Sequence, residues 1–254
     1  MTLKKLRLPA LLLTAACLVA ASAARATVTE NFKQTYPLAA DGVVHLENVN
    51  GDIDITAWDK AEVSLEAEKR GKTTEDLAKV TLEIESSPAK LSIKTKYAKT
   101  GWFHSNVNAS VRYKLMVPAG ARLQKIDSVN SDITVTGVHG AVNLDTVNGT
   151  ITARGLMADA RLDSVNGGLH AEFASLDQVH DVKLDSVNGR AELTLPKGAS
   201  AEISADSVNG RVSVDQSIKL GKAGRHSLTG GIGAGGGPRI VLDTVNGGIA
   251  IRER

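Results

Sequence analysis

The chain has very little cysteine, few aromatic residues and only one long apolar run. Its single cysteine, Cys17, lies near the N-terminus, so the rest of the chain has no thiol that could form a disulfide bond or act as a nucleophile. Aromatic residues make up only 3% of the chain, which excludes a core built on bulky rings. Stability must therefore come from hydrogen bonds and from packed Val, Ile, Leu and Ala side chains.

The one long apolar run begins at Leu8 and ends near Ala24, where Ala24-Arg25-Ala26 supplies a small-x-small cleavage site. Basic residues precede the run. This order predicts a secretory signal peptide over residues 1–26, cleaved to leave Thr27 first. The run is shorter than the ~20 apolar residues that a spanning helix needs, and we expect no transmembrane segment in the mature chain.

Cys17 offers an alternative anchor. The segment Leu13-Thr14-Ala15-Ala16-Cys17 is similar to a lipoprotein processing site, although Thr14 stands where leucine is usual. In that case Cys17 would carry a lipid. With or without the lipid, the chain is expected to be exported, to the periplasm, the cell envelope or the medium.

Little positive charge remains once residues 1–26 are removed. The basic residues lost are Lys4, Lys5, Arg7 and Arg25. The mature chain then has 26 basic against 28 acidic residues, a net charge of −2. No Lys/Arg-rich stripe remains to neutralise phosphates, which excludes nucleic acid as a partner. An envelope protein or a glycan is the expected partner.

What the chain does contain is a repeat, Asp-Ser/Thr-Val-Asn-Gly, in seven copies counting close variants. Its asparagines are Asn50, Asn130, Asn148, Asn166, Asn188, Asn209 and Asn246. From Asn130 onward the intervals are 18, 18, 22, 21 and 37 residues. The near-constant period predicts stacked coils, and the longer intervals predict loop insertions.

Apolar residues alternate with polar ones on both sides of each asparagine. Four residues before it stand Leu46, Ile126, Leu144, Leu162, Leu184, Ala205 and Leu242. Six before it stand Val44, Val142, Ala160, Val182, Ile203 and Ile240, with Gln124 as the exception. Three after it come Ile53, Ile133, Ile151, Leu169, Ala191, Val212 and Ile249, and five after it Ile55, Val135, Ala153, Ala171, Leu193, Val214 and Ile251. Such alternation predicts two strands per repeat.

The two strands have opposite parity about the asparagine, which predicts a corner at Val-Asn-Gly, where Asn and Gly tolerate positive φ. One repeat cannot bury its apolar stripes alone, so neighbours must stack about 4.8 Å apart. We therefore expect an all-β fold, a right-handed parallel β-helix or β-solenoid built from repeats of about 18–22 residues. A β-sandwich or wrapped sheet is the alternative.

Residues 27–121 are less regular and are expected to form a β-rich N-terminal cap, continuous with the repeat solenoid of residues 122–254 in one domain. Strands are predicted over 62–67, 80–86, 91–97 and 109–117. A helical turn or two is predicted over 74–79, and a hairpin connection over 87–90.

The chain resembles the bacterial putative adhesin family, a domain of unknown function. The resemblance lies in the signal peptide, the β-rich N-terminal part, the segment Tyr113-Lys114-Leu115-Met116-Val117-Pro118 and the series of Val-Asn-Gly repeats that follows it. The resemblance covers nearly the whole mature chain and is carried mainly by the repeats. It implies a β-helix found in secreted and envelope proteins. It brings no catalytic residues to carry over.

The asparagine column is expected to be structural, because stacked Asn side chains hydrogen-bond to the copies on either side. We predict that truncating Asn166 leaves buried corner groups unpaired, and that Asn246, near the C-terminus, lies at an end of the stack and is less costly to truncate. Changing Ser164 to Thr should be mild, since Thr146 and Thr244 occupy that column.

A column of carboxylates accompanies the asparagines: Asp127, Asp145, Asp163, Asp185, Asp206 and Asp243. At about 4.8 Å, neighbouring carboxylates repel by about 0.9 kcal/mol in water and about 3.5 kcal/mol at an effective dielectric of 20. Pairing with Lys125, Arg161 and Lys183, two residues earlier, would relieve the repulsion. A bound calcium ion is the alternative, although the glycine-dense pattern of calcium-binding β-rolls is absent.

Other reactive groups fit architecture better than chemistry. The Ser/Thr of the repeat recurs too often to be a single activated nucleophile. The histidines show no metal-ligand spacing: they are His45, His104, His139, His170, His180 and His226. Gly231 to Gly236 matches a dinucleotide-binding pattern, but Pro238 and a predicted strand follow instead of a helix. We expect a glycine-rich loop there, with no metal and no cofactor.

The sequence therefore predicts an envelope scaffold or binding module without catalytic activity. The rival is a polysaccharide lyase or hydrolase, because β-helix enzymes mount paired carboxylates on a stacked sheet. Only Trp58, Trp102 and a few Tyr and Phe residues could serve as sugar platforms, and Phe173 alone lies next to the repeat columns.

Overall fold

The fold is known from a computed structural model, which describes residues 27–98, 108–215, 222–234 and 236–254. The expected signal peptide and Cys17 lie outside the described residues. The described chain folds into two large sheets of ten and eleven strands, and one five-residue helix, α1 (Thr74–Ala78), accompanies them. The all-β class predicted from the alternation is confirmed.

We call the two sheets A and B. In spatial order, sheet A contains β1 (Val28–Pro37), β4 (Glu62–Gly71), β7 (Ala109–Pro118), β3 (Ile53–Trp58), β9 (Ile133–Thr136), β11 (Ile151–Leu156), β13 (Leu169–Phe173), β15 (Ala191–Leu195), β21 (Ile249–Glu253) and β17 (Val212–Val214). Sheet B contains β18 (Lys222–Ala223), β19 (Ser227–Ile232), β16 (Ala201–Ser207), β20 (Arg239–Thr244), β14 (Asp181–Asn188), β12 (Ala160–Asn166), β10 (Val142–Asn148), β8 (Arg122–Asn130), β2 (Val43–Glu47), β6 (Lys90–Tyr97) and β5 (Val80–Ser87).

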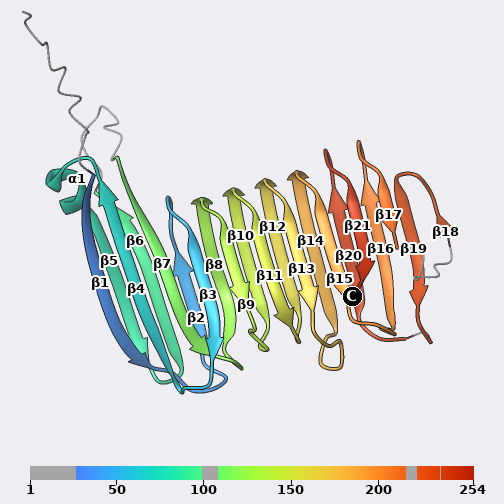
Figure 1. Ribbon diagram of the computed structural model, residues 1–254, viewed down its shortest axis with the longest axis horizontal. Helices are drawn as coiled ribbons and strands as arrows, with labels where there is room; N and C mark the ends of the chain where they lie inside the picture. Colours follow the sequence, from blue (N-terminus) through green and yellow to red (C-terminus); the bar gives the residue numbers. More distant parts are fainter. Residues whose placement is uncertain (1–26, 99–107, 216–221, 235) are drawn as a thin grey trace, which may run out of the picture.

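Each repeat contributes one strand to each sheet, and we call such a pair of strands a rung. Successive rungs pair in parallel and in register, so that Asp145 lies beside Asp163 in sheet B and Ile151 lies beside Leu169 in sheet A. Figure 1 shows the rungs following one another along the long axis of the molecule. Equivalent residues of the repeats therefore form columns that run across the strands.

The four apolar columns form the core between the sheets. Their members are buried, apart from Val214, which packs partly buried against the core near the end of sheet A. The exception at Gln124 has a structural reason. A β-bulge in β8 shifts the register, so that Leu123, fully buried, pairs with Val142, while Gln124 is exposed.

The last rung in the sequence is not the last in space. Strand β20 lies between β14 and β16, and β21 lies between β15 and β17. Asp243 accordingly pairs with Asp185 on one side and with Asp206 on the other. In Figure 1 the two red strands of this rung stand inside the stack. The expectation that Asn246 lies at an end is therefore wrong, because the chain returns to an inner position.

The 37-residue interval before that rung is more than a glycine-rich loop. Its described part contains β19, which pairs antiparallel with β16 and covers the edge of sheet B, and the short β18. Gly231 lies within β19, so the expectation of a loop across Gly231 to Gly236 is wrong at its start. Strand β20, rather than a helix, follows Pro238, which removes the dinucleotide-binding interpretation.

The corner glycines are required by close stacking rather than by positive φ. No described residue other than glycine has positive φ, and of the glycines that follow a repeat asparagine only Gly51 has it. A Cβ on Gly167 would lie 1.8 Å from the carbonyl oxygen of Gly149 on the preceding rung. The prediction of left-handed corners is therefore wrong for most copies, because glycine serves there to let backbones approach.

The N-terminal part follows the predicted strands closely, with β4, β5, β6 and β7 over the expected segments and α1 over the expected helical turn. Strand β1 was not predicted. It pairs antiparallel with β4 at the edge of sheet A, and most of its residues are exposed, so its sequence lacks the alternation of a half-buried strand. Strands β2 and β3 continue both sheets into the repeats by pairing with β8 and β9.

Candidate functional site

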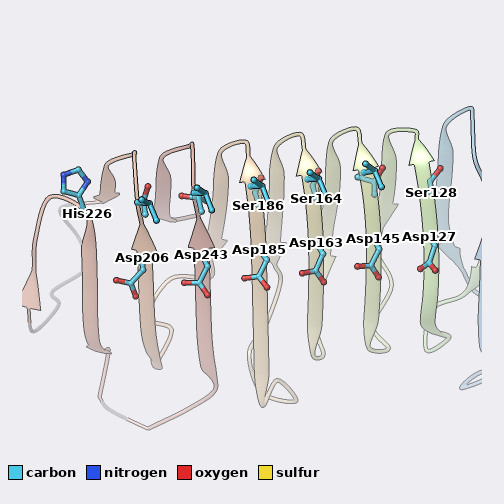
Figure 2. Close-up of a pocket in the computed structure, with 18 of the residues that line it drawn as sticks. Asp127, Ser128, Asp145, Asp163, Ser164, Asp185, Ser186, Asp206, His226 and Asp243 are labelled. Carbon is cyan, nitrogen blue, oxygen red and sulfur yellow. The ribbon is translucent and has the colours of Figure 1, made fainter.

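The outer face of sheet B carries a groove that runs across the repeat strands. Residues four and two positions before each asparagine point inward, so those three and one before it point outward. The outward positions hold the aspartate column and a column of valines. Between them lies a groove of about 810 Å³, whose lining includes the six aspartates from Asp127 to Asp206 and which ends against His226 and Ser227. Figure 2 shows the aspartates in one row, with Asp243 between Asp185 and Asp206.

The valine column is the part of the site that the sequence prediction missed. Val129, Val147, Val165, Val187 and Val245 are 38–41% exposed, and Val208 on the last rung is 67% exposed. A signal was present in the sequence, because a valine next to an inward Ser/Thr must face outward on an alternating strand. The outer face of sheet B is thus an exposed apolar stripe beside an acidic one.

Three of the aspartates have the basic partners that the sequence suggests. Lys125 Nζ lies 3.4 Å from Asp127 Oδ2, Arg161 Nε lies 2.8 Å from Asp163 Oδ2, and Lys183 Nζ lies 2.6 Å from Asp185 Oδ2. All three bases come from the position two residues earlier on the same strand. At these three rungs, basic side chains of the protein itself reduce the repulsion between neighbouring aspartates.

The other three rungs have no base at that position. Asn143, Val241 and Ser204 stand two residues before Asp145, Asp243 and Asp206. Burial, with the neighbouring Asp163 and Asp127 carboxylates, raises the pKa of Asp145 to about 6. Burial and the neighbouring Asp185 and Asp206 carboxylates likewise raise the pKa of Asp243. The groove therefore presents carboxylates whose charge is only partly compensated.

The Ser/Thr column lies under the groove and is buried. Ser164 Oγ donates to the Gly149 carbonyl at 3.1 Å, and Ser186 Oγ donates to the Gly167 carbonyl at 3.1 Å, each on the preceding rung. These hydroxyls satisfy corner carbonyls that stacking would otherwise leave unpaired. Their repeated use as donors within the corner does not favour a nucleophilic role.

The asparagines form one row of hydrogen bonds at the corner. In each step the Nδ2 of one Asn donates to the Oδ1 of the Asn on the preceding rung at 2.8 Å, in the order Asn50, Asn130, Asn148, Asn166, Asn188, Asn246, Asn209. The repeat asparagines from Asn130 onward are exposed. The expectation of buried corner groups is therefore wrong, because the amides face solvent.

Comparison with known families places this architecture. Residues 44–252 match the Toastrack DUF4097 family. The chain belongs to this family. The resemblance suggested by the Val-Asn-Gly train is thereby confirmed, and the match includes both the repeats and most of the N-terminal strands.

One solved structure shares the overall fold of this Toastrack chain at low identity. A putative cell adhesion protein from Clostridium sporogenes is 14% identical, with a TM-score of 0.53, and the alignment covers 89% of this chain and all of that one. A putative adhesin from Bacteroides fragilis is 12% identical over 89% of this chain and 97% of that one, with a TM-score of 0.41. No protein of curated function matches the chain.

The remaining polar candidates of this Toastrack chain do not form a metal cluster where the structure describes them. Within the described residues, no group of three His, Cys, Asp or Glu side chains is placed to hold a metal ion. His170 instead pairs with Glu192, with 3.1 Å between Nδ1 and Oε2, while His104 lies outside the described residues. No helix in the described part of the chain is long and apolar enough to cross a membrane.

The described Trp, Tyr and Phe side chains also lie away from the groove. Phe173 is fully buried and cannot stack on a sugar. Trp58 donates its indole N–H to the Glu62 carbonyl at 2.7 Å and lies under Lys60, at the end of β3 in sheet A. Trp102 lies outside the described residues. Among the residues that the structure describes, the one ring that lines the groove is the imidazole of His226.

Proposed function

We propose that this protein is an exported, non-catalytic binding module of the cell envelope and that the outer groove of sheet B is its binding surface. One observation carries the proposal: an outward aspartate and an exposed valine recur as a pair on six adjacent rungs, and all six aspartates and every one of these valines except Val129 line one continuous groove. A surface of this regularity suits a long ligand better than a small molecule.

The valines are the informative half of this pattern. A solvent-facing strand position normally carries a polar residue, because only the opposite face is packed. Threonine would satisfy the preference of strands for β-branched side chains without exposing apolar surface, yet all six outward positions hold valine. Contiguous exposed apolar surface of this kind is typical of an interaction site.

Two further lines support the assignment to the envelope. The residues before Thr27 have the order of a secretory signal, with basic residues, an apolar run and a small-x-small site in turn. The structural relative from Clostridium sporogenes is described as a putative cell adhesion protein. A lipid on Cys17 would hold the module at a membrane surface, and cleavage before Thr27 would release it.

We also propose that the two sheets close into a right-handed parallel β-solenoid, with residues 27–121 as a cap continuous with the repeats of 122–254. Each rung passes from sheet B to sheet A and returns to a parallel neighbour in sheet B. Connections between parallel strands of a sheet are almost always right-handed, which supports that sense of winding. An experimental structure would test the handedness directly.

A retention assay tests the binding function. Purified protein is incubated with envelope protein and with peptidoglycan from the producing cells, each immobilised separately. The variant Val165→Thr/Val187→Thr keeps the strand preference and the shape of the groove but removes its apolar character. We expect this variant to lose retention, while Thr134→Ala/Thr152→Ala on the outer face of sheet A keeps it. Equal retention of both variants would contradict the proposal.

The enzymatic rival has a separate test. Glycosidases need two carboxylates in different environments, one an acid and one a base or nucleophile, whereas the aspartates here form one repeated column. We expect no new reducing ends and no unsaturated products from peptidoglycan or common polysaccharides. Turnover that disappears on changing a single carboxylate would revive the enzyme.

A further inference from the structure

We propose that the groove on sheet B binds a cationic, amphipathic α-helix that lies across the strands, with its apolar stripe on the valine column and its Lys/Arg stripe on the aspartate column. This inference rests on the proposed function, since it names the partner class of the same groove. It is argued from the spacing of the rungs, the charge of the groove and the distribution of its apolar side chains.

The spacing of the rungs favours a helix. Neighbouring strands lie about 4.8 Å apart, and an α-helix returns the same face every 5.4 Å. A helix laid across the strands therefore drifts by only about 0.6 Å per rung, or about 3 Å over six rungs, which long Lys and Arg side chains can absorb.

Other regular chains fit this spacing less well. An extended strand presents the same face only every ~6.7 Å, so it falls out of step with the rungs within three contacts. A polyproline II chain returns its face every ~9.3 Å and meets only every second rung. From Asp127 to Asp206 the groove crosses six rungs, about 24 Å, which matches about 16 residues of α-helix.

The charge of the groove requires cations on the partner. Six aspartates face three bases, so Asp145, Asp243 and Asp206 have no base two residues earlier on their strands. Asp243 and Asp206 are adjacent in sheet B. Lysine or arginine side chains from a bound helix would supply the missing partners at these three rungs, while the intrinsic bases serve the other three.

The valine column requires that the partner also has an apolar stripe. It runs parallel to the aspartates, one outward position further along each strand, so the partner needs an apolar stripe directly beside its cationic one. An anionic membrane surface does not satisfy this pattern, because the carboxylates would repel its headgroups. A glycan is disfavoured because, within the described part of the chain, His226 supplies the one ring among the lining residues.

The two ends of the groove differ. At one end His226 and Ser227, just before and at the start of β19, form a wall. At the other end Glu47 continues the acidic column, but Lys94 and Lys125 both pair with it and hold its pKa down, at about 2. The uncompensated charge therefore lies between Asp145 and Asp206, and the cations of the helix should concentrate there.

The test uses the purified chain and a synthetic peptide of Leu and Lys, about 18 residues long, whose leucines fall on one helical face. A scrambled peptide of the same composition controls for charge alone, and fluorescence anisotropy measures both. We expect the amphipathic peptide to bind at least about tenfold more tightly than the scrambled one. Val165→Thr/Val187→Thr should weaken that binding about tenfold, whereas Thr134→Ala/Thr152→Ala should leave it unchanged.

Asp145→Asn/Asp243→Asn tests the acidic side. It should weaken binding about tenfold at low ionic strength, and the difference should shrink as salt is added. Thermal melts show whether each variant is folded. If the Asp→Asn variant is unstable, the Val→Thr variant still tests the proposal, because threonine keeps the shape of the valine side chain.

The outcomes separate this inference from the proposed function. If the two peptides bind equally, or if the valine variant binds the amphipathic peptide like the wild type, the helix proposal is overturned. If no peptide binds while the valine variant still loses retention on envelope material, the groove binds a different partner and only the proposed function stands. If the valine variant keeps both peptide binding and retention on envelope material, the helix proposal and the proposed function are both overturned.

Discussion

At the residue scale, the glycine of the repeat is required by the short distance between the backbones of neighbouring rungs. The corner glycines following Asn148, Asn166, Asn188, Asn209 and Asn246 each leave less than 2 Å between a built Cβ and a carbonyl oxygen of a neighbouring rung. Glycine therefore stands at these corners because no side chain fits between stacked carbonyls. The copy that carries Ser131 instead stacks on Gly51, the one corner glycine with positive φ.

This contact predicts a sharp difference between two adjacent glycines. Gly167→Ala places a Cβ 1.8 Å from the Gly149 carbonyl oxygen, so the rungs must separate. At Gly168 the closest atom to a Cβ is a nitrogen of His170 at 3.3 Å, the end of a movable side chain. We expect Gly167→Ala to lower the free energy of unfolding by about 3 kcal/mol and Gly168→Ala by under about 1 kcal/mol.

Urea melts of the two variants measure this difference. Gly168→Ala is the matched control, since it makes the same change one residue away. Equal losses would mean that the general loss of glycine, and not the stacking contact, sets the cost.

The rungs without a base predict a pH dependence. Burial and the Asp163 and Asp127 carboxylates raise the pKa of Asp145 to about 6 from 3.8, while Arg161 and Lys125 face it from the adjacent strands. A raised acid pKa favours the protonated folded form, so this contribution is present below about pH 4 and is lost as the pH rises through about 6. Solvent screening reduces it to about 1 kcal/mol.

Asn143→Arg should remove this dependence by supplying the base that Arg161 supplies on the next rung. The replaced amide gives up one long hydrogen bond, from its Nδ2 to the Gln124 carbonyl at 3.3 Å, while its Oδ1 is buried without a partner. Lys183 already lies beside Arg161 in the same column, so neighbouring bases are accommodated there. We expect the variant to be about 1 kcal/mol more stable than the wild type at pH 7 and equal to it at pH 4. Melts at both pH values check this, and a gain of the same size at pH 4 would exclude the carboxylate as its cause.

At the scale of the elements, each strand is held to its neighbours by columns as well as by backbone pairing. The asparagine row runs in one direction, every Nδ2 donating toward the N-terminal end of the stack. An interior asparagine therefore takes part in two of these hydrogen bonds. Asn209, on the rung that is last in space, takes part in one such hydrogen bond within the described residues.

Truncation should follow this order in space and not the order in sequence. Asn166→Ala and Asn246→Ala each remove two side-chain hydrogen bonds at an exposed corner, and we expect each to cost about 1–2 kcal/mol. Asn209→Ala removes one and should cost about half as much. Denaturant melts of the three variants measure the costs, and the result that would contradict the row is an Asn246→Ala variant no more costly than Asn209→Ala.

At the scale of the whole molecule, much of the architecture is encoded locally and some is not. Alternation about each asparagine predicted two strands per repeat, the buried columns and the bases beside Asp127, Asp163 and Asp185. It did not predict the position of the last rung, because near-identical repeats can stack in any order and local pattern cannot choose among them. The exposed valine stripe was not predicted, because alternation marks which positions are buried and does not show that the outward ones join across rungs into a groove.

The return of the chain to an inner position predicts an unusual pattern of protection. Strands β20 and β21 are bonded on both edges, whereas β17 lies at the edge of sheet A. Amides protected by neighbours on both sides open only with larger parts of the structure. We expect the β20–β21 amides, although close to the C-terminus, to exchange hydrogen as slowly as those of β14–β15 and more slowly than those of β17.

Deletion of residues 238–254 tests directly whether the β20–β21 rung lies inside the stack. It takes a rung from inside the stack, so that β14, β15 and β16 each lose one of two partners and β17 loses its single partner in sheet A. Such a truncation should prevent β16–β19 from docking and expose apolar core residues such as Leu184 and Leu193. We expect aggregation or a fall in melting temperature of more than 15 °C, on the order of several kcal/mol. A truncated chain that melts like the full one, with β20–β21 amides exchanging rapidly in the intact protein, would place the last rung outside the stack.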